Sequence, residues 1–373
     1  MAGRLPLTAL LSQAFVAFTI ECDNEFERRM PHRTAAHPSS ASRREVPWLT
    51  SMVMWFTCLR FLTDGGRSVA EIDRLARTST NWNGMERWGY IEVAPDPADP
   101  RPRPPRRDWI VRATPGGRRA QAFWAPIGAE VEGRWRERFG SSVVAQLRNH
   151  LTAVATNLDP GLPECLPILG YGLFSRLPEH KPQRAPAAQA SAEGLEVGPI
   201  ELPSLLANIL LAVALEFEDH WPISLATGSD ILRVIDTGGQ RLRDLPGQSG
   251  VSKEAIAMAL GVLTKAGLVE LGPAPGDARG LVVRLTGLGA AAQLANAQRL
   301  AAIEASLPAR YDRDAVNGLR SSLEEIVQPD AGRSPLFDGL LPHPGGWRAS
   351  VPPPARLPHF PMVLHRGGYP DGS

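Results

Sequence analysis

Apolar side chains recur every three or four positions over most of the chain, a spacing that predicts a mainly helical protein. The pattern predicts helices over 7–30, 48–63, 68–76, 78–88, 118–139, 141–157, 202–219, 224–236, 240–245, 252–266, 286–306 and 312–327. Short apolar runs predict strands over 90–94, 109–113, 268–271 and 281–285. The strands come in two pairs, and residues 272–280 in the second pair form a turn-rich tip, so each pair predicts a two-stranded ribbon.

Four segments recur in the same order in the two halves of the chain. One such match is weak evidence, whereas four matches in one order indicate duplication. The matching segments are 10–21 with 205–216, 88–93 with 266–271, 110–114 with 282–286, and 117–121 with 289–293. We therefore predict two related units, of which the first has the longer loops.

The turn-forming residues suggest where these units begin and end. We predict a first unit over 1–159, a linker rich in Pro and Gly over 160–201, and a second unit over 202–327. Residues 328–373 form a tail that is also rich in Pro and Gly. Because the tail contains apolar residues such as Phe360, the sequence leaves open whether it packs onto the folded body.

The order of elements in each unit is typical of a winged helix-turn-helix. In the second unit, Ser252 is a plausible N-cap for the helix over 252–266, and Gly267 is suited to end that helix. A two-stranded ribbon follows. In this motif the second helix of the pair enters the major groove of DNA, and the ribbon tip reaches phosphates or the adjacent minor groove.

The ribbon residues resemble the wing signature of the MarR family. The resemblance lies in Asp277, Arg279, Val283, Leu285, Thr286 and Gly289, preceded by Leu263, Gly267, Leu268 and Val269. The first unit matches at Arg107, Val111, Thr114 and Gly117, but Pro105 replaces the acidic residue. The resemblance implies a mainly α fold with small β-wings, in which two tandem MarR-like winged helix-turn-helix units form a pseudo-dimer.

The function implied is that of a sequence-specific transcription regulator that binds double-stranded DNA through recognition helices at 78–88 and 252–266. Gly84 lies inside the first of these helices and lowers its helical propensity, which leaves base reading by the first unit in doubt. Unlike units predict an asymmetric operator, bound by a monomeric pseudo-dimer or a homodimer. The expected DNA-binding residues are Thr78, Ser79, Thr80, Asn81, Asn83, Arg101, Arg103, Arg106, Arg107, Ser252, Lys253, Glu254, Ala257 and Arg279.

Overall charge adds a requirement to this interpretation. The 373 residues carry 40 basic and 39 acidic side chains, a net charge of +1, so a DNA-binding surface requires clustered cations. One cluster is the RPRPPRR run over 101–107 in the first wing, which is otherwise interpreted as a solvated loop. The three cysteines form no CxxC pair, which favours a reducing cytoplasm over a disulfide framework or a zinc ribbon.

The N-terminal segment contains an apolar run over 5–20 that Ser12 and Gln13 interrupt, so a helix is favoured over a signal peptide. No apolar stretch is long enough to predict a membrane span. The frequent use of Ala, Arg and Pro is typical of a high-GC bacterial genome, as in actinobacteria.

Aromatic residues at Trp48, Trp55 and Phe56 suggest either a pocket for a small aromatic effector, as many MarR-like proteins have, or ordinary core packing. No HExxH, GxSxG or Walker motif is present, so we expect neither an enzyme, nor a cofactor, nor a metal site. Two alternatives stay open. One is a winged-helix protein-interaction module that has lost specific DNA binding, and the other is an enzyme that uses the tail.

Overall fold

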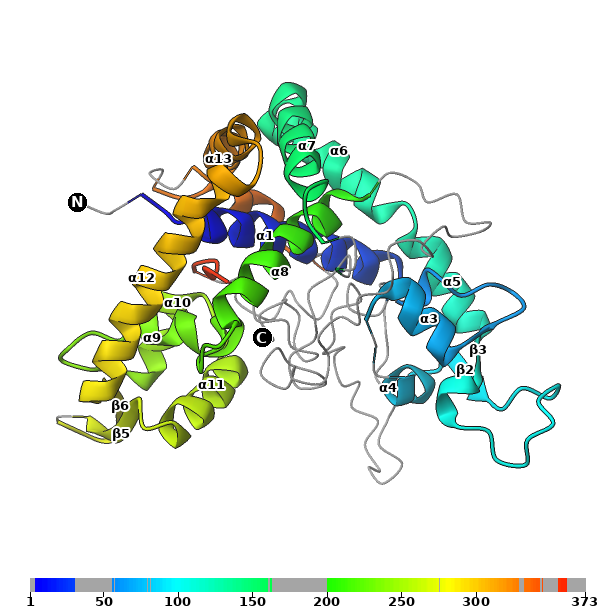
Figure 1. Cartoon of the computed structure of the whole chain (residues 1–373), viewed down its shortest axis with the longest axis horizontal. Coiled ribbons are helices and arrows are strands. Elements are labelled where there is room, and N and C mark those ends of the chain that lie inside the picture. The colour runs from blue at the N-terminus through cyan, green and yellow to red at the C-terminus, as the bar shows by residue number, and fades with distance from the viewer. Residues whose placement is uncertain are drawn as a thin grey trace.

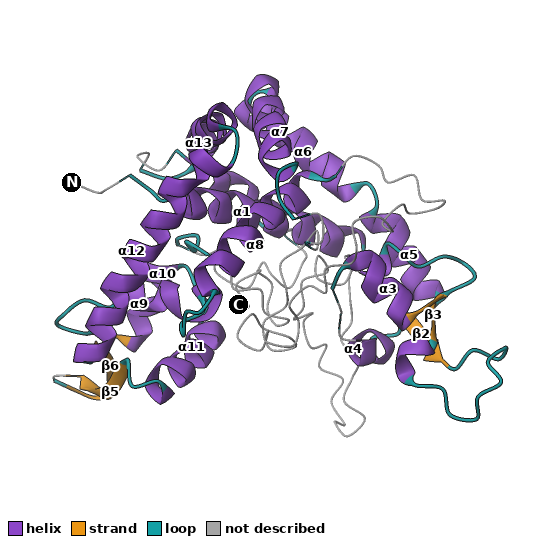
Figure 2. Cartoon of the chain, viewed as in Figure 1, coloured by secondary structure: helices purple, strands orange, loops and turns teal. Residues whose placement is uncertain are grey.

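The computed structural model describes residues 4–30, 56, 58–78, 80, 82–159, 162, 200–274, 276–328, 332–342, 344 and 355–360. The protein is mainly helical and has two small three-stranded antiparallel sheets. A central group of helices carries a lobe on each side (Figure 1), and the strands lie at the far ends of the lobes (Figure 2). None of the described helices combines the length and hydropathy that a membrane crossing requires.

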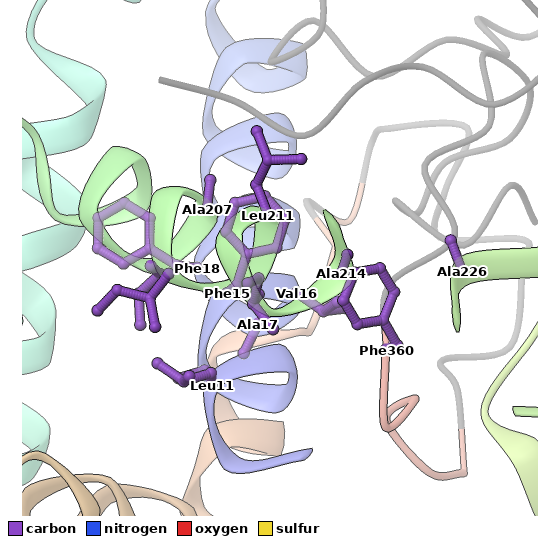
Figure 3. Close-up of a cluster of buried hydrophobic side chains, with 14 of the residues drawn as sticks. Leu11, Phe15, Val16, Ala17, Phe18, Ala207, Leu211, Ala214, Ala226 and Phe360 are labelled. Atoms are coloured by element: carbon purple, nitrogen blue, oxygen red, sulfur yellow. The ribbon is translucent and has the colours of Figure 1, made fainter. Parts of the chain in front are cut away.

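The central helices come from both halves of the chain. They are α1 (Leu7–Arg29), α6 (Ile127–Phe139), α7 (Ser141–Ala155), α8 (Leu202–Glu218) and α13 (Arg313–Val327). Helix α1 packs against α8, and α7 packs against α13. Phe15 and Phe18 of α1 lie beside Ala207 and Leu211 of α8 (Figure 3). One hydrophobic core therefore joins the two halves.

Each lobe contains short helices followed by a ribbon and a further helix. The first lobe consists of β1 (Arg67–Ser68), α3 (Val69–Ala76), α4 (Trp82–Arg87), β2 (Ile91–Ala94), β3 (Ile110–Ala113) and α5 (Pro115–Trp124). The second lobe consists of η3 (Leu225–Ser229), α9 (Asp230–Val234), β4 (Gln240–Arg241), η4 (Leu242–Asp244), α10 (Leu245–Ser249), α11 (Lys253–Lys265), β5 (Val269–Ala274), β6 (Asp277–Leu285) and the start of α12 (Gly287–Arg310).

The two sheets share both strand order and register. Their orders are β1-β3-β2 and β4-β6-β5. Residues that the repeat places at equivalent positions pair with equivalent partners. The pairs are Arg67 with Val111 and Ile91 with Ala113 in the first sheet, and Gln240 with Val283 and Val269 with Leu285 in the second. The lobes are thus built on the same local plan.

A threonine fixes the junction between each ribbon and the following helix. The Thr286 hydroxyl donates to the carbonyl oxygen of Gly267 at 2.7 Å and accepts from the Gly289 amide at 3.0 Å. Thr114 makes both contacts in the first lobe, with Gly89 at 2.6 Å and Gly117 at 3.0 Å. The hydroxyl therefore caps the helix and ties it to the start of the ribbon.

Gly289 allows the close approach at this junction. A Cβ at residue 289 would lie far inside van der Waals contact with the carbonyl oxygen of Leu268, whereas a Cβ at Gly287 would meet open space. We expect Gly289→Ala to lower the free energy of unfolding by about 2 kcal/mol, because backbone must move. Gly287→Ala is the matched control and is expected to be neutral or slightly stabilising. Urea denaturation measures both, and equal effects would contradict the expectation.

The central helices contact one another crosswise. In the first half, Arg148 donates to the carbonyl oxygen of Ile200, just before α8, at 2.9 Å. In the second half, Arg320 donates to the carbonyl oxygen of Leu5, just before α1, also at 2.9 Å. His150 of α7 lies 3.2 Å from Ser322 of α13, measured from Nδ1 to Oγ. Equivalent residues of the two halves thus exchange equivalent contacts.

Three predicted elements were wrong. The helix over 118–139 is divided into α5 and α6, because Pro126 has no N–H to donate and interrupts the backbone ladder. The residues over 240–245 start as strand β4, and Pro246 lies in the first turn of α10 rather than ending a helix. Most of the predicted tip over 272–280 is paired strand.

The described parts of the tail belong to the folded body. Helical turn η5 (Pro335–Gly339) packs on α1, and Leu336 and Leu340 are fully buried. The Asn24 side chain of α1 donates to the carbonyl oxygen of Leu340 at 3.3 Å. Further on, Phe360 is only 2% exposed. Leu336, Leu340 and Phe360 therefore add to the core.

Candidate nucleic-acid interface

A groove of about 970 Å³ lies between α11, the β5–β6 ribbon and the η4–α10 segment of the second lobe. Much of its surface is apolar and comes from Leu260, Leu271 and Leu281. Four cationic side chains also line it, and they come from two stretches of chain, the β4–η4 segment and α11. They are Arg241, Arg243, Lys253 and Lys265.

Helix α11 presents one face to this groove. Its N-cap is Ser252, whose hydroxyl accepts from the Ala255 amide at 3.2 Å. Ser252 is 4% exposed, so its side chain caps the helix and is not available to a base edge. Lys253, Ala257 and Lys265 are exposed, and all three line the groove.

The turn before α11 depends on Gly250. This residue ends α10 with a φ of +75°, in the left-handed region that favours glycine. The chain then reverses direction into the cap of α11. A helix, a tight turn and a second helix with one exposed face therefore precede the ribbon, and the groove lies between that second helix and the ribbon.

The cations of the groove are accessible. The Arg243 side chain is 67% exposed and lies 3.6 Å from Asp244, a solvent-exposed pair of small energetic value. Within the described part of the chain, neither Lys253 nor Lys265 forms an ion pair, and both are exposed. Among the described residues, Lys253 and Lys265 thus contribute exposed positive charge to the groove.

Sequence reasoning found Lys253 and Ala257 but missed Lys265 and the two arginines. Lys265 lies inside the predicted helix over 252–266, which was a usable signal for it. No comparable signal existed for Arg241 and Arg243, because their segment was wrongly predicted as one helix, whereas it folds as β4 and η4.

In the first lobe the predicted reading helix is shorter than 78–88, because α4 begins only at Trp82. Thr78 and Thr80 precede it and are half-buried, while Asn83 lies on α4 and is exposed. Ser79 and Asn81 lie outside the described residues. Of the candidates on this helix, Asn83 is the one with clear access to solvent among those the structure describes.

The tip of the β2–β3 ribbon in the first lobe is ordered by its own ion pairs. Arg101 contacts Asp99 at 2.5 Å and Asp108 at 2.7 Å, and this guanidinium lowers the pKa of Asp99 to about 2. Arg106 pairs with Glu86 of α4 at 3.0 Å. The charges of Arg101 and Arg106 are therefore largely satisfied within the lobe.

The other two arginines of this tip, Arg103 and Arg107, face solvent. The Arg107 side chain is 78% exposed and lies 3.7 Å from Asp108, and Arg103 is also exposed. The indole N–H of Trp109 donates to the carbonyl oxygen of Pro104 at 3.0 Å, which anchors the tip between them. Of the four predicted contacts, Arg103 and Arg107 are the best placed to meet an anion.

The remaining candidates divide into two groups. Phe56 is 4% exposed, and its ring stacks on Trp124 with centroids 4.5 Å apart, so it contributes to the core. The rest of the aromatic set, Trp48 and Trp55, lies outside the described residues. The same holds for the side chains of Glu254 and Arg279, although their backbones lie in α11 and β6.

The chain matches no model of a known protein family, no curated protein and no solved structure. The resemblance of its second ribbon to the MarR wing signature therefore stays a prediction. What the chain does has to be inferred from its own residues and from the geometry of its two lobes.

Proposed function

We propose that this chain is a sequence-specific DNA-binding regulator. Its two lobes would be unlike winged-helix DNA-binding units, here called the first and second heads, carried on one pseudo-dimeric group of central helices. The observation that carries the proposal is the cationic groove beside the exposed face of α11. The crosswise contacts of Arg148 and Arg320 support the pseudo-dimer, because equivalent groups meet across the core as they do in a twofold dimer.

The geometry of the second lobe supports a role in reading a base sequence. An exposed helix of the length of α11 fits the major groove, and a ribbon tip beside it reaches the flanking backbone. Arg241, Arg243, Lys253 and Lys265, which line the groove beside this helix, would then contact phosphates. The small Ala257 and Gly261 leave the middle of α11 free to approach base edges.

The two heads differ in what they offer to DNA. The second has a 13-residue α11 and a tight ribbon, whereas the first has a six-residue α4 and a long ribbon tip with exposed arginines. We therefore infer that the second head contacts base edges. The first head would contact phosphates or a narrow minor groove through Arg103 and Arg107. The expected operator is asymmetric, and a perfect palindrome bound by two chains would contradict this arrangement.

One observation favours a second function. Leu271 and Leu281, which line the groove, are 42% and 45% exposed. Apolar side chains grouped on a surface are a common feature of protein-binding sites. The alternative is accordingly a winged-helix module that binds another protein instead of DNA.

The deciding experiment is selection of genomic DNA fragments by the full-length protein at about 50 and about 200 mM salt, followed by sequencing. One enriched motif whose affinity falls steeply with salt supports the regulator. No enrichment at either salt contradicts it, and pull-down with the same protein then tests the interaction module.

A further inference from the structure

A short stretch of the tail, residues 355–360, crosses the boundary between the central helices and the second lobe. We call it the C-terminal strap. The Ser12 hydroxyl of α1 donates to the carbonyl oxygen of Pro358 at 2.8 Å. The Phe360 amide donates to Asp230 of α9 at 2.9 Å. The strap thus bonds to a central helix on one side and to the second lobe on the other.

The strap is anchored by two buried apolar side chains. Leu357 and Phe360 are each 2% exposed. The ring of Phe360 points toward Val16 of α1 and Ala214 of α8 (Figure 3). Burial of side chains of this size stabilises docking far more than one exposed contact does. The strap is therefore held in place as firmly as a core element.

The strap also contacts the turn at Gly250 that precedes α11 and sets its orientation. At Gly250 a Cβ would lie 2.7 Å from the carbonyl oxygen of Arg356 and from the backbone nitrogen of Pro358. Gly250 joins α10 to α11, so any shift of the strap bears directly on the angle between these helices. Close packing at a backbone turn leaves little freedom for that angle.

Asp230 makes the contact specific. Its side chain is only 3% exposed, and a buried carboxylate is unfavourable unless it is paired and hydrogen-bonded. Its partners include the Arg233 side chain at 3.3 Å and the strap amide of Phe360. Undocking of the strap removes one of these partners. The carboxylate and the strap therefore depend on each other.

We propose that the C-terminal strap acts as an intramolecular ligand that fixes the orientation of the second head on the central helices. The strap closes a slot formed by α1, α8, α9 and the α10–α11 turn. When it is docked, α11 holds one position relative to the first lobe. Its consequence for DNA rests on the proposed function, whereas its mechanical role does not.

The test compares two full-length variants by hydrogen exchange. Phe360→Ala removes the anchor of the strap, and Leu340→Ala removes a fully buried side chain of the same tail that packs elsewhere. We expect amide exchange over α9–α11 to rise about tenfold in Phe360→Ala alone, with α3 of the first lobe unchanged. Equal acceleration in both lobes, or none in α9–α11, would overturn the proposal.

A DNA readout separates the strap from the function. The wild-type protein is expected to discriminate against an operator with one extra base pair between its two contact regions, and Phe360→Ala to bind both operators alike. If the wild type binds no DNA, the proposed function fails while the exchange result still decides the strap. If Phe360→Ala discriminates as the wild type does, the strap does not set the head position.

Acid provides a further prediction about the strap. Burial lowers the pKa of His359 from its ordinary 6.5 to about 3, and the cations Arg233 and Arg356 add to this shift. A released strap therefore binds a proton more readily than a docked one, so docking weakens as the pH falls from about 6.5 toward 3. The opposing group is Asp230, whose pKa burial raises.

Substitution of His359 isolates its contribution to the pH dependence of docking, because the Asp230 carboxylate is present in both proteins. Between pH 7 and pH 5, exchange over α9–α11 is expected to accelerate more in the wild type than in His359→Gln. Comparison at each pH cancels the intrinsic pH dependence of exchange. Identical profiles for the two proteins would show that His359 has no role in docking.

Discussion

Lys253→Glu is expected to weaken DNA binding about tenfold at moderate salt, and the double variant Lys253→Glu/Lys265→Glu about 100-fold. Each lysine of the groove neutralises one phosphate in the proposed complex, and each reversal adds repulsion. The slope of log affinity against log salt is accordingly expected to fall by about 2 in the double variant. Titration of a labelled operator at several salt concentrations measures both quantities.

The matched control for this prediction is Arg313→Glu. Arg313 is exposed and opens α13, just as Lys253 opens α11, so both changes place a carboxylate at a helix N-terminus where it is tolerated. Helix α13 lies among the central helices, away from the two sheets (Figure 1). Equal losses in Lys253→Glu and Arg313→Glu would mean that net charge, and not the groove, determines binding.

Arg138→Met is expected to lower the free energy of unfolding by about 3 kcal/mol. The Glu21 side chain is 2% exposed and accepts from Arg138 at 2.7 Å and from the Trp135 indole at 2.9 Å. After removal of the guanidinium, the buried Glu21 carboxylate keeps the Trp135 N–H as a partner, together with the more distant Arg134 at 3.7 Å. Urea denaturation followed by far-UV circular dichroism measures the loss.

The repeat provides the control for this second prediction. Arg310 and Glu216 form the equivalent ion pair in the second half, but their side chains are 44% and 36% exposed. Arg310→Met is therefore expected to cost no more than about 1 kcal/mol. A cost for Arg310→Met as large as that for Arg138→Met would contradict the view that burial decides the value of the pair.

Elements that depend on neighbours in sequence were predicted best from the sequence. Helices α1, α8, α11 and α13 lie within a few residues of their predicted ranges, because the period of their apolar side chains and their capping residues are local properties. The mainly helical fold with small sheets was also predicted correctly. The junction at Thr286 and Gly289 belongs to the same class, since one hydroxyl and one missing Cβ determine it.

The candidate site was predicted only in part. Lys253 and Ala257 follow from the start of α11, and Arg107 from its place at a ribbon tip. Which arginines would be accessible to an anion was not predicted. Arg101 is paired with Asp99 and Asp108, whereas Arg241 lines the groove from strand β4. Pairing and convergence of this kind depend on which segments pack together.

The sequence by itself determined the helical periods, the duplicated order of segments and the local turns, since these depend on residues a few positions apart. Only the tertiary structure decided that Glu21 is buried, that the strap docks on Asp230 and that four cations share one groove. The physical reason is that burial and electrostatic pairing depend on distances between elements that pack together in space, whatever their separation in the chain. A periodic pattern shows which face of a helix is covered, but not which element covers it.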